Sequence, residues 1–267
     1  MNRFLLWITV MKQIYRDILD SLDRYEKIAV ATVVSAQGST PRATGAKMLI
    51  FPDGTFRHTV GGGVFESLVI QDALAVLQDG KSIIKNYSFN QEGKYATGAV
   101  CGGQVEVMIE MITNAPHLVI IGGGHVGQAL AKAALMLDFN ITIVDDRKEY
   151  TESVQTENRI KRMHTTPDYR ELPEITENSY ICLVTKGYPT DESALRNVIK
   201  SSAKYIGMIG SKKKILTVYD NMQKDGYDRL LFERIHAPIG IDIGADSPEE
   251  IAVSILAEII RVKNKKV

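Results

Sequence analysis

The chain has 267 residues, of which 32 are Lys or Arg and 32 are Asp or Glu, so its formal net charge at neutral pH is zero. This balance does not indicate a nucleic-acid or membrane-surface partner, and the 45% hydrophobic and 24% charged residues are typical of a globular protein. Cys101 and Cys182 are the two cysteines, which excludes a disulfide framework and a zinc site built on several thiolates. We expect one large or two ordinary domains in a reducing, cytoplasmic compartment. Because symmetric dimers are the commonest oligomers of soluble proteins, we also expect a homodimer.

The first ten residues faintly resemble a secretory signal, because an arginine precedes an apolar run. No small-residue cleavage site follows, and the run is far shorter than a membrane span. We therefore expect residues 1–10 to be peripheral to function and an amphipathic helix to begin near Met11.

The N-terminal half predicts strands, a hairpin and a helix. Pro52-Asp53-Gly54 is a turn tripeptide between two apolar runs, which indicates a β-hairpin. The expected elements are strands at 28–35, 47–51, 55–60 and 105–112, a helix at 64–78 and a polar stretch at 86–97. Residues 113–116 mark the best domain boundary, giving domains at 1–113 and 117–267.

A strand, a glycine turn, a helix and a second strand follow from Leu118 to Arg147. Gly122, Gly124 and Gly127 form G-x-G-x-x-G, in which the first glycine permits the turn, the second admits a pyrophosphate and the third lets the helix lie close to the strand. Asp145 ends the second strand, where a carboxylate accepts a hydrogen bond from a ribose 2′-hydroxyl and favours NAD over NADP. Arg147 nearby weakens that preference.

The remaining chain continues the alternation of strands and helices, which predicts a doubly wound parallel sheet. Strands are expected at 180–185 and 205–209, and helices at 192–201 and 213–225. Ser247, Pro248 and Glu250 predict a capping box at the start of the last helix.

Other candidate ligand contacts lie in glycine-rich loops. Gly61-Gly62-Gly63 before a helix suits a phosphate or is a tight turn, and Glu66 is either functional or an ordinary first-turn acid. Gly210-Ser211, followed by three lysines, is a second anion candidate, with a solvated basic turn as the alternative.

Four single residues are further candidates. Ser39 and Arg42 lie in a polar loop in which the arginine suits a phosphate, and His125 lies within the G-x-G-x-x-G turn at 122–127. Cys101 is a candidate soft ligand for a transition metal or a carrier of sulfur, or else a small buried residue. Cys182 is predicted to lie in the core.

Seven segments follow one another along the chain: GSTPRATGAKM (38–48), VGGGVFE (60–66), CGG (101–103), GGGHVG (122–127), VDDR (144–147), YIGMIGSKKK (205–214) and PIGIDIGADSPEEIAVSILAEII (238–260). In this order they resemble the XdhC/CoxI family, accessory proteins of molybdenum hydroxylases such as xanthine dehydrogenase. The resemblance implies an α/β fold, with an N-terminal XdhC/CoxI domain built on a mixed sheet and a C-terminal Rossmann-like domain.

The resemblance also implies a function. Family members bind molybdenum cofactor (molybdopterin), assist its sulfuration by a cysteine desulfurase and deliver it to a molybdenum hydroxylase client. One departure is Tyr188, since many members carry a histidine in the corresponding turn, while Asp191 is retained. We expect a cofactor-insertion protein with its ligand between two glycine-rich domains and no nucleic-acid or membrane partner. The alternatives are an oxidoreductase that uses NAD or NADP and a nucleotide-sensing regulatory module.

Overall fold

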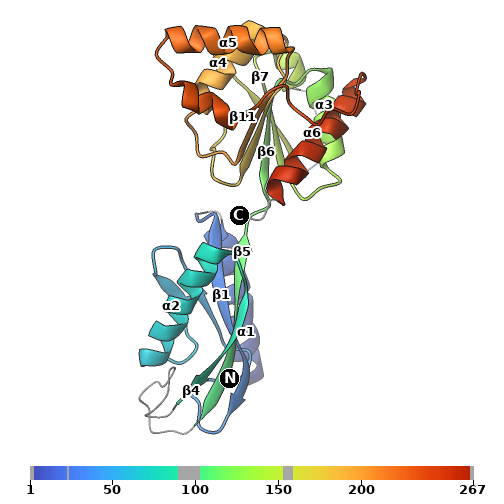
Figure 1. The fold of residues 1–267 in the computed structure, drawn as a ribbon. Helices are drawn as coiled ribbons and strands as arrows, with labels where there is room; N and C mark the ends of the chain where they lie inside the picture. Colours follow the sequence, from blue (N-terminus) through green and yellow to red (C-terminus); the bar gives the residue numbers. More distant parts are fainter. Residues whose placement is uncertain (1–2, 23, 90–102, 153–158, 265–267) are drawn as a thin grey trace. The chain divides into compact units, whose positions relative to one another are not determined.

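The computed structural model describes residues 3–22, 24–89, 103–152 and 159–264, and the chain divides into two compact units, Met1–Asn114 and Ala115–Val267. Each unit contains its own sheet (Figure 1). Each unit also has its own hydrophobic clusters. The two units are therefore described separately.

Unit 1 is an antiparallel sheet of five strands in the order β3-β2-β1-β5-β4. Its elements are α1 (Arg3–Leu22), β1 (Lys27–Gln37), β2 (Lys47–Ile50), β3 (Phe56–His58), α2 (Gly63–Asp79), β4 (Ile83–Ser88) and β5 (Gln104–Thr113). The loop between β1 and β2 carries the GSTPR segment (residues 38–42), which places that motif at one end of the sheet.

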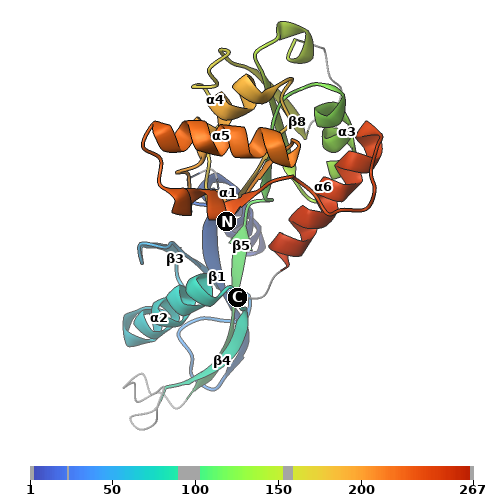
Figure 2. The ribbon, with the colours of Figure 1, turned by 45° about the horizontal axis from the view of Figure 1, so that its top comes forward.

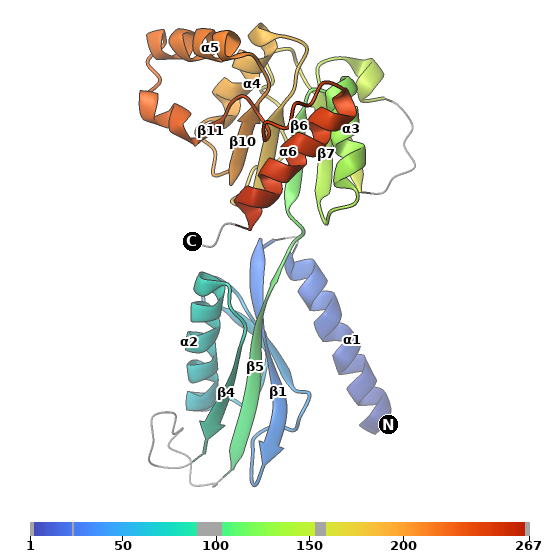
Figure 3. The same cartoon turned by 45° about the vertical axis from the view of Figure 1, so that its right-hand side comes forward.

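Alternation along β1 gives the sheet of unit 1 two buried faces. Ala29 and Ala31 point to the cluster beneath α2, whereas Ile28 and Val30 point to the cluster that includes Ile14 of α1. Figure 3 shows the two helices on opposite sides of the strands. The sheet is thus the middle layer of unit 1.

Unit 2 is a parallel sheet of six strands in the order β11-β10-β9-β6-β7-β8. Its elements are β6 (His117–Ile121), α3 (His125–Ala134), β7 (Asn140–Asp145), η1 (Lys148–Tyr150), β8 (Ile160–His164), β9 (Ser179–Leu183), α4 (Tyr188–Val198), β10 (Tyr205–Met208), α5 (Lys212–Lys224), η2 (Arg229–Arg234), β11 (Ile235–His236) and α6 (Pro248–Lys263). The strand order is that of the Rossmann fold, so the predicted fold class is confirmed.

Both faces of the parallel sheet are covered by helices, which explains why β6 and β9 are continuous apolar runs. Ile121 and Leu183 pack with α4 and α5, whereas Ile120 and Cys182 pack with α3 and α6. The two helix pairs lie on opposite sides of the sheet in Figures 1 and 2. Ser247 caps α6 through the predicted capping box with Glu250.

The structure corrects several details of the expected elements. α1 begins at Arg3 rather than near Met11, and α4 begins at Tyr188, four residues early, because Gly187 and a first-turn proline start it. The unit 1 sheet is antiparallel in each described pairing rather than mixed. A short hairpin connects β2 to β3, and β1 runs opposite to both β2 and β5. β4 (Ile83–Ser88) was not predicted, and its last three residues overlap the polar stretch that we expected at 86–97.

Candidate functional site

The loops at the carboxyl edge of the parallel sheet bring the C-terminal motifs to one side of unit 2. Ligands of such sheets bind outside this edge, where the strand order reverses. Here the reversal lies between β6 and β9. The loops at the edge carry Gly122–Gly124 after β6, Asp145–Arg147 at the end of β7, Thr185–Gly187 after β9 and Gly210–Ser211 after β10.

The G-x-G-x-x-G turn has the geometry that its spacing predicts. A Cβ atom on Gly127 would lie 1.9 Å from the carbonyl oxygen of Gly122, and one on Gly122 would lie 2.4 Å from that of Val184. A Cβ on Gly124 would instead meet nothing within 4 Å. Because the first turn of a helix leaves backbone N–H groups without intrahelical partners, the open position at Gly124 fits a phosphate group. His125 follows as the exposed first residue of α3.

Asp145 lies inside the turn rather than facing solvent, with its side chain 1% exposed. Its Oδ2 accepts hydrogen bonds from the Gly123 amide at 2.6 Å and from Arg147 Nη2 at 3.0 Å. Its Oδ1 accepts from the Arg147 amide and from Nε, both at 2.9 Å. Burial alone would raise the pKa of Asp145, but the hydrogen bonds from Arg147 and Gly123 outweigh it and lower the pKa below its ordinary value.

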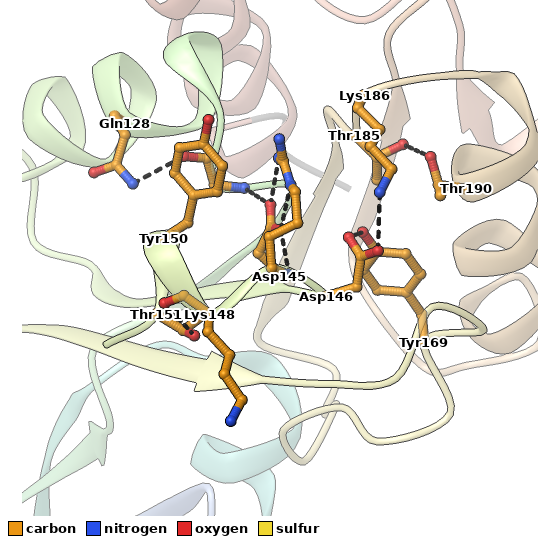
Figure 4. Close-up of polar contacts among 12 residues, drawn as sticks. Gln128, Asp145, Asp146, Lys148, Tyr150, Thr151, Tyr169, Thr185, Lys186 and Thr190 are labelled. Atoms are coloured by element: carbon orange, nitrogen blue, oxygen red, sulfur yellow. Dashed lines mark hydrogen bonds and ion pairs between the residues drawn. The ribbon is translucent and has the colours of Figure 1, made fainter. Parts of the chain in front are cut away.

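Three residues that the sequence analysis did not single out hold Arg147 in place. The guanidinium of Arg147 lies 4.1 Å from the ring centroid of Tyr150. Arg162 donates to the carbonyl of Tyr150 at 2.8 Å and to Oε1 of Gln128 at 2.9 Å. Gln128 in turn donates to the carbonyl of Gly123 at 2.9 Å (Figure 4). These bonds connect η1, β8 and α3 around the glycine turn.

A second polar group joins the loops after β7 and β9. Asp146, whose side chain is buried, accepts from Lys186 Nζ at 3.0 Å and from the Tyr169 hydroxyl at 3.2 Å (Figure 4). Burial raises the pKa of Tyr169, so its hydroxyl remains protonated and can act as a donor. The position of Asp146 and Lys186 directly after two parallel strands is the sequence signal that could have identified them.

The expected anion site at Gly210-Ser211 is organised around an ion pair. Ser211 caps α5 by accepting from the amide of Lys214, whose ammonium group bonds the fully buried carboxylate of Asp191. The Thr185 hydroxyl donates to the same carboxylate at 2.7 Å. Burial raises the pKa of Asp191, and the bonds from Lys214 and Thr185 offset this only partly. Lys214, one of the three lysines, therefore forms an ion pair inside unit 2.

Three motifs that lie far apart in the sequence of unit 1 meet at the GSTPR loop. A Cβ on Gly61 would lie 2.5 Å from Cγ of Pro41, and one on Gly103 would lie 2.2 Å from the carbonyl oxygen of Ser39. Neither position has room for a side chain. The loop therefore packs against the triple-glycine turn and against the end of the CGG segment, as close approach requires of glycine.

Glu66 occupies part of the triple-glycine turn. Its Oε1 accepts from the Thr59 hydroxyl and from the amides of Val60 at 3.2 Å and Gly61 at 3.3 Å. A Cβ on Gly62 or Gly63 would meet nothing within 4 Å, so that half of the turn is open. The structure thus gives Glu66 a definite structural contact, and it leaves the Gly62–Gly63 half accessible to a ligand.

The other predicted residues are dispersed. Ser39 and Arg42 are exposed on the GSTPR loop, whereas Cys101 lies outside the described residues. Cys182 is completely buried, as predicted for a core residue, and burial raises the pKa of its thiol. Among the described residues, no cluster of three His, Cys, Asp or Glu side chains could hold a metal ion. Nor does that part of the chain contain a helix long and apolar enough to span a membrane.

Comparisons with known proteins give the family. The model described as the XdhC Rossmann domain matches residues 118–259, and the model described as the XdhC and CoxI family matches residues 21–88. The chain is 34% identical to the uncharacterized protein YqeB of Escherichia coli (strain K12), over 88% of this chain and 43% of that protein. It therefore spans less than half the length of this relative.

Two further proteins are similar along nearly their whole length. One is a probable xanthine dehydrogenase subunit from Bacillus subtilis (strain 168), 22% identical over 94% of this chain and 98% of the relative. The other is a crystal structure of a xanthine dehydrogenase from Bacillus halodurans, 19% identical with a TM-score of 0.51, over 94% of this chain and 96% of that one. That structure supports the fold. The Rossmann-domain model covers more than half of the chain, and the second model covers most of unit 1. The chain therefore belongs to the XdhC and CoxI family.

Proposed function

We propose that the protein is an accessory factor of a molybdenum hydroxylase of the xanthine dehydrogenase type. It binds molybdenum cofactor, assists the sulfuration of that cofactor by a cysteine desulfurase and inserts it into the hydroxylase. Membership of the XdhC and CoxI family supports this role. The observation that carries the proposal is the packing of the GSTPR loop against Gly61 and Gly103, because it gathers three separated motifs of unit 1 at one place.

The residues at that place fit the phosphate end of molybdopterin. The positions of Gly62 and Gly63 are open where a Cβ would otherwise lie, and α2 begins there with backbone N–H donors. Arg42 is exposed on the neighbouring GSTPR loop and offers a planar guanidinium for bidentate phosphate binding. Cys101 is proposed as the soft ligand for the metal or its sulfur. When bound, the cofactor supplies a molybdenum centre held by dithiolene sulfurs.

A second candidate function rests on the Rossmann turn of unit 2. The opening at Gly124 beside the start of α3 fits the pyrophosphate of NAD or NADP, and the strand order is that of dinucleotide-binding proteins. This observation favours a nucleotide-dependent oxidoreductase or a nucleotide-sensing regulatory module. Nucleotide binding in unit 2 is also compatible with cofactor handling by unit 1.

The deciding experiment is titration of the purified protein with molybdenum cofactor under anaerobic conditions, followed by activation of an apo-hydroxylase. We expect Arg42→Ala to weaken cofactor binding about tenfold, as for the loss of a charge-assisted hydrogen bond, and Cys101→Ala to reduce activation. Arg170→Ala, which removes an exposed arginine of unit 2, is the matched control and should leave both unchanged. Tight binding of NAD or NADP with no binding of molybdenum cofactor would overturn the proposed role.

A further inference from the structure

The carboxylate at the end of β7 has no acceptor position left for a ribose. An ionised carboxylate offers about four lone-pair sites. Asp145 uses four, since the amides of Gly123 and Arg147 and two guanidinium nitrogens of Arg147 donate to its oxygens at 2.6 to 3.0 Å. A ribose 2′-hydroxyl that donated to Asp145 would have to displace one of these bonds.

Arg147 is the group that remains accessible at this position. Its side chain is 27% exposed, against 1% for Asp145. A guanidinium has five N–H donors in a planar fork, and two of them bond Asp145. In the described part of the chain this leaves Nη1 and the second N–H of Nη2 for a ligand. The two side chains therefore differ in what they offer a ligand: the carboxylate of Asp145 is buried, whereas the guanidinium of Arg147 is partly exposed and has N–H donors left.

The surroundings hold Arg147 in this orientation before a ligand arrives. Its guanidinium stacks on Tyr150, and a Cβ on Gly123 would lie 2.8 Å from Cβ of Tyr150, so the ring packs directly on the glycine turn. Arg162 fixes the backbone of Tyr150, and Gln128 connects Arg162 to the turn. A donor that is already ordered loses little conformational entropy on binding, which favours affinity.

The nearby charges also favour an anion. Asp146 is bonded to Lys186 at 3.0 Å and Asp145 to Arg147, so each buried carboxylate is paired with a more exposed cation. Lys148 adds a further positive charge, with its side chain 71% exposed and its ammonium nitrogen 3.8 Å from Oε1 of Glu152. A phosphate monoester carries a charge of about −1.5 to −2 at neutral pH and is bound well by arginine.

We propose that Arg147, and not Asp145, determines ligand specificity at the end of β7, so that unit 2 binds a nucleotide with a ribose 2′-phosphate in preference to one with a free 2′-hydroxyl. Asp145 is then a positioning residue that orients Arg147 and anchors it to Gly123. The proposal goes beyond the cofactor-insertion role and rests on the nucleotide candidate for the Rossmann turn. It reverses the preference for NAD that an acid at this position predicts from sequence.

The test uses two probes that differ in the ribose phosphate. The full-length protein is titrated calorimetrically with 2′,5′-ADP and with 5′-ADP, and then with NADP and NAD. We expect the 2′-phosphate compound of each pair to bind at least about tenfold tighter, the size of a charge-assisted bidentate contact. The preference should fall as the salt concentration rises, because the contact is partly exposed.

Variants of Arg147 separate this contact from general electrostatics. Arg147→Ala should abolish the preference or invert it in favour of 5′-ADP, since Asp145 then becomes available to a 2′-hydroxyl. Arg147→Lys should give an intermediate preference, because a lysine keeps the charge but loses the fork. Lys161→Ala removes an exposed charge from β8 at the position paired with Thr142, away from the end of β7, and is the matched control, with an expected change of less than about twofold.

A further variant keeps the test decisive if Arg147→Ala does not fold. Asp145→Asn keeps Arg147 but removes the charge that orients it, so the preference for 2′,5′-ADP should fall although the guanidinium is still present. Equal or tighter binding of 5′-ADP by the wild-type protein, binding of neither compound, or a preference that survives Arg147→Ala would overturn the proposal. The titration with molybdenum cofactor is a separate measurement, so failure here is distinguishable from failure of the proposed insertion role.

Discussion

Two glycine turns that precede helices, Gly61–Gly63 and Gly122–Gly124, donate backbone hydrogen bonds to acids from different parts of the fold. In unit 1 the acid that accepts from the turn is Glu66, which belongs to the first turn of α2 itself and bonds the amide of Gly61. In unit 2 the corresponding acid is Asp145, which comes from the neighbouring strand and bonds the amide of Gly123. Among the residues that the structure describes, only the second acid is paired with an arginine.

This difference decides what each turn can bind. Both turns retain an open half, at Gly62–Gly63 and at Gly124. A carboxylate beside a helix N-terminus stabilises the helix but opposes an incoming anion, because like charges repel. In unit 2 the cation of Arg147 offsets that repulsion, whereas in unit 1 we expect Arg42 of the neighbouring GSTPR loop to supply a positive charge. A glycine pattern alone therefore does not define an anion site.

The largest effect is expected for Gly127→Ala. The added methyl group would lie 1.9 Å from the carbonyl oxygen of Gly122, so α3 would have to move away from β6. Overpacking of this kind costs about 3 kcal/mol, and a backbone contact leaves little room for relief. Urea denaturation measures the loss. A change below about 1 kcal/mol would contradict the close packing of helix and strand, and Gly124→Ala is the matched control.

The next effect concerns Asp145→Asn and its dependence on pH. Removing one partner of a buried pair costs about 2 kcal/mol here, a value reduced because Arg147 is partly exposed. Since the pKa of Asp145 is lowered in the folded state, its contribution to stability is present above the ordinary carboxyl pKa and is lost as the pH falls through the folded-state value.

The measurement is the free energy of unfolding of wild type and Asp145→Asn between neutral pH and about pH 3. The difference between the two proteins should shrink as the pH falls. Asp220→Asn, on the exposed side of α5, is the control. A difference that stays constant across this range would mean that the charge of Asp145 does not stabilise the turn.

The sequence predicted the architecture better than the chemistry of the site. Apolar runs such as Leu118–Ile121 identified the parallel sheet because both of its faces are buried. The edge strand β8 was missed because it carries Lys161 and Arg162, as edge strands often do. β4, another edge strand, alternates with polar residues that resemble a loop.

The site was only partly predictable for a different reason. The roles of Gly122 and Gly127 follow from backbone geometry, which their spacing fixes. The orientation of Arg147 depends on Tyr150 of η1, and the position of Tyr150 depends on Arg162 of β8. Contacts of this kind are tertiary, and no local pattern contains them. Ligand binding at these residues stays a prediction.

A smaller effect is expected for Glu66→Gln in unit 1. The amide oxygen retains an acceptor for the turn, but the charge is lost, so stability should fall by about 1 kcal/mol. At the same time the affinity of the Gly62–Gly63 half for inorganic phosphate should rise, because the repulsion is removed. Thermal denaturation and a phosphate titration followed by NMR measure the two changes. A lower phosphate affinity than in wild type would show that Glu66 is not an opposing charge.

The smallest effect on stability is expected for Gly124→Ala, three residues before the position with the largest. Its φ of −67° suits any residue and a Cβ would meet nothing within 4 Å, so only the weaker capping tendency of alanine counts, about 0.5 kcal/mol. The methyl group nevertheless occupies the space in which a phosphate would approach the start of α3. Binding of 2′,5′-ADP should therefore weaken about tenfold while the melting temperature changes little. If affinity and stability change together, Gly124 is only a folding element, and the contrast between the two glycine turns loses its functional meaning.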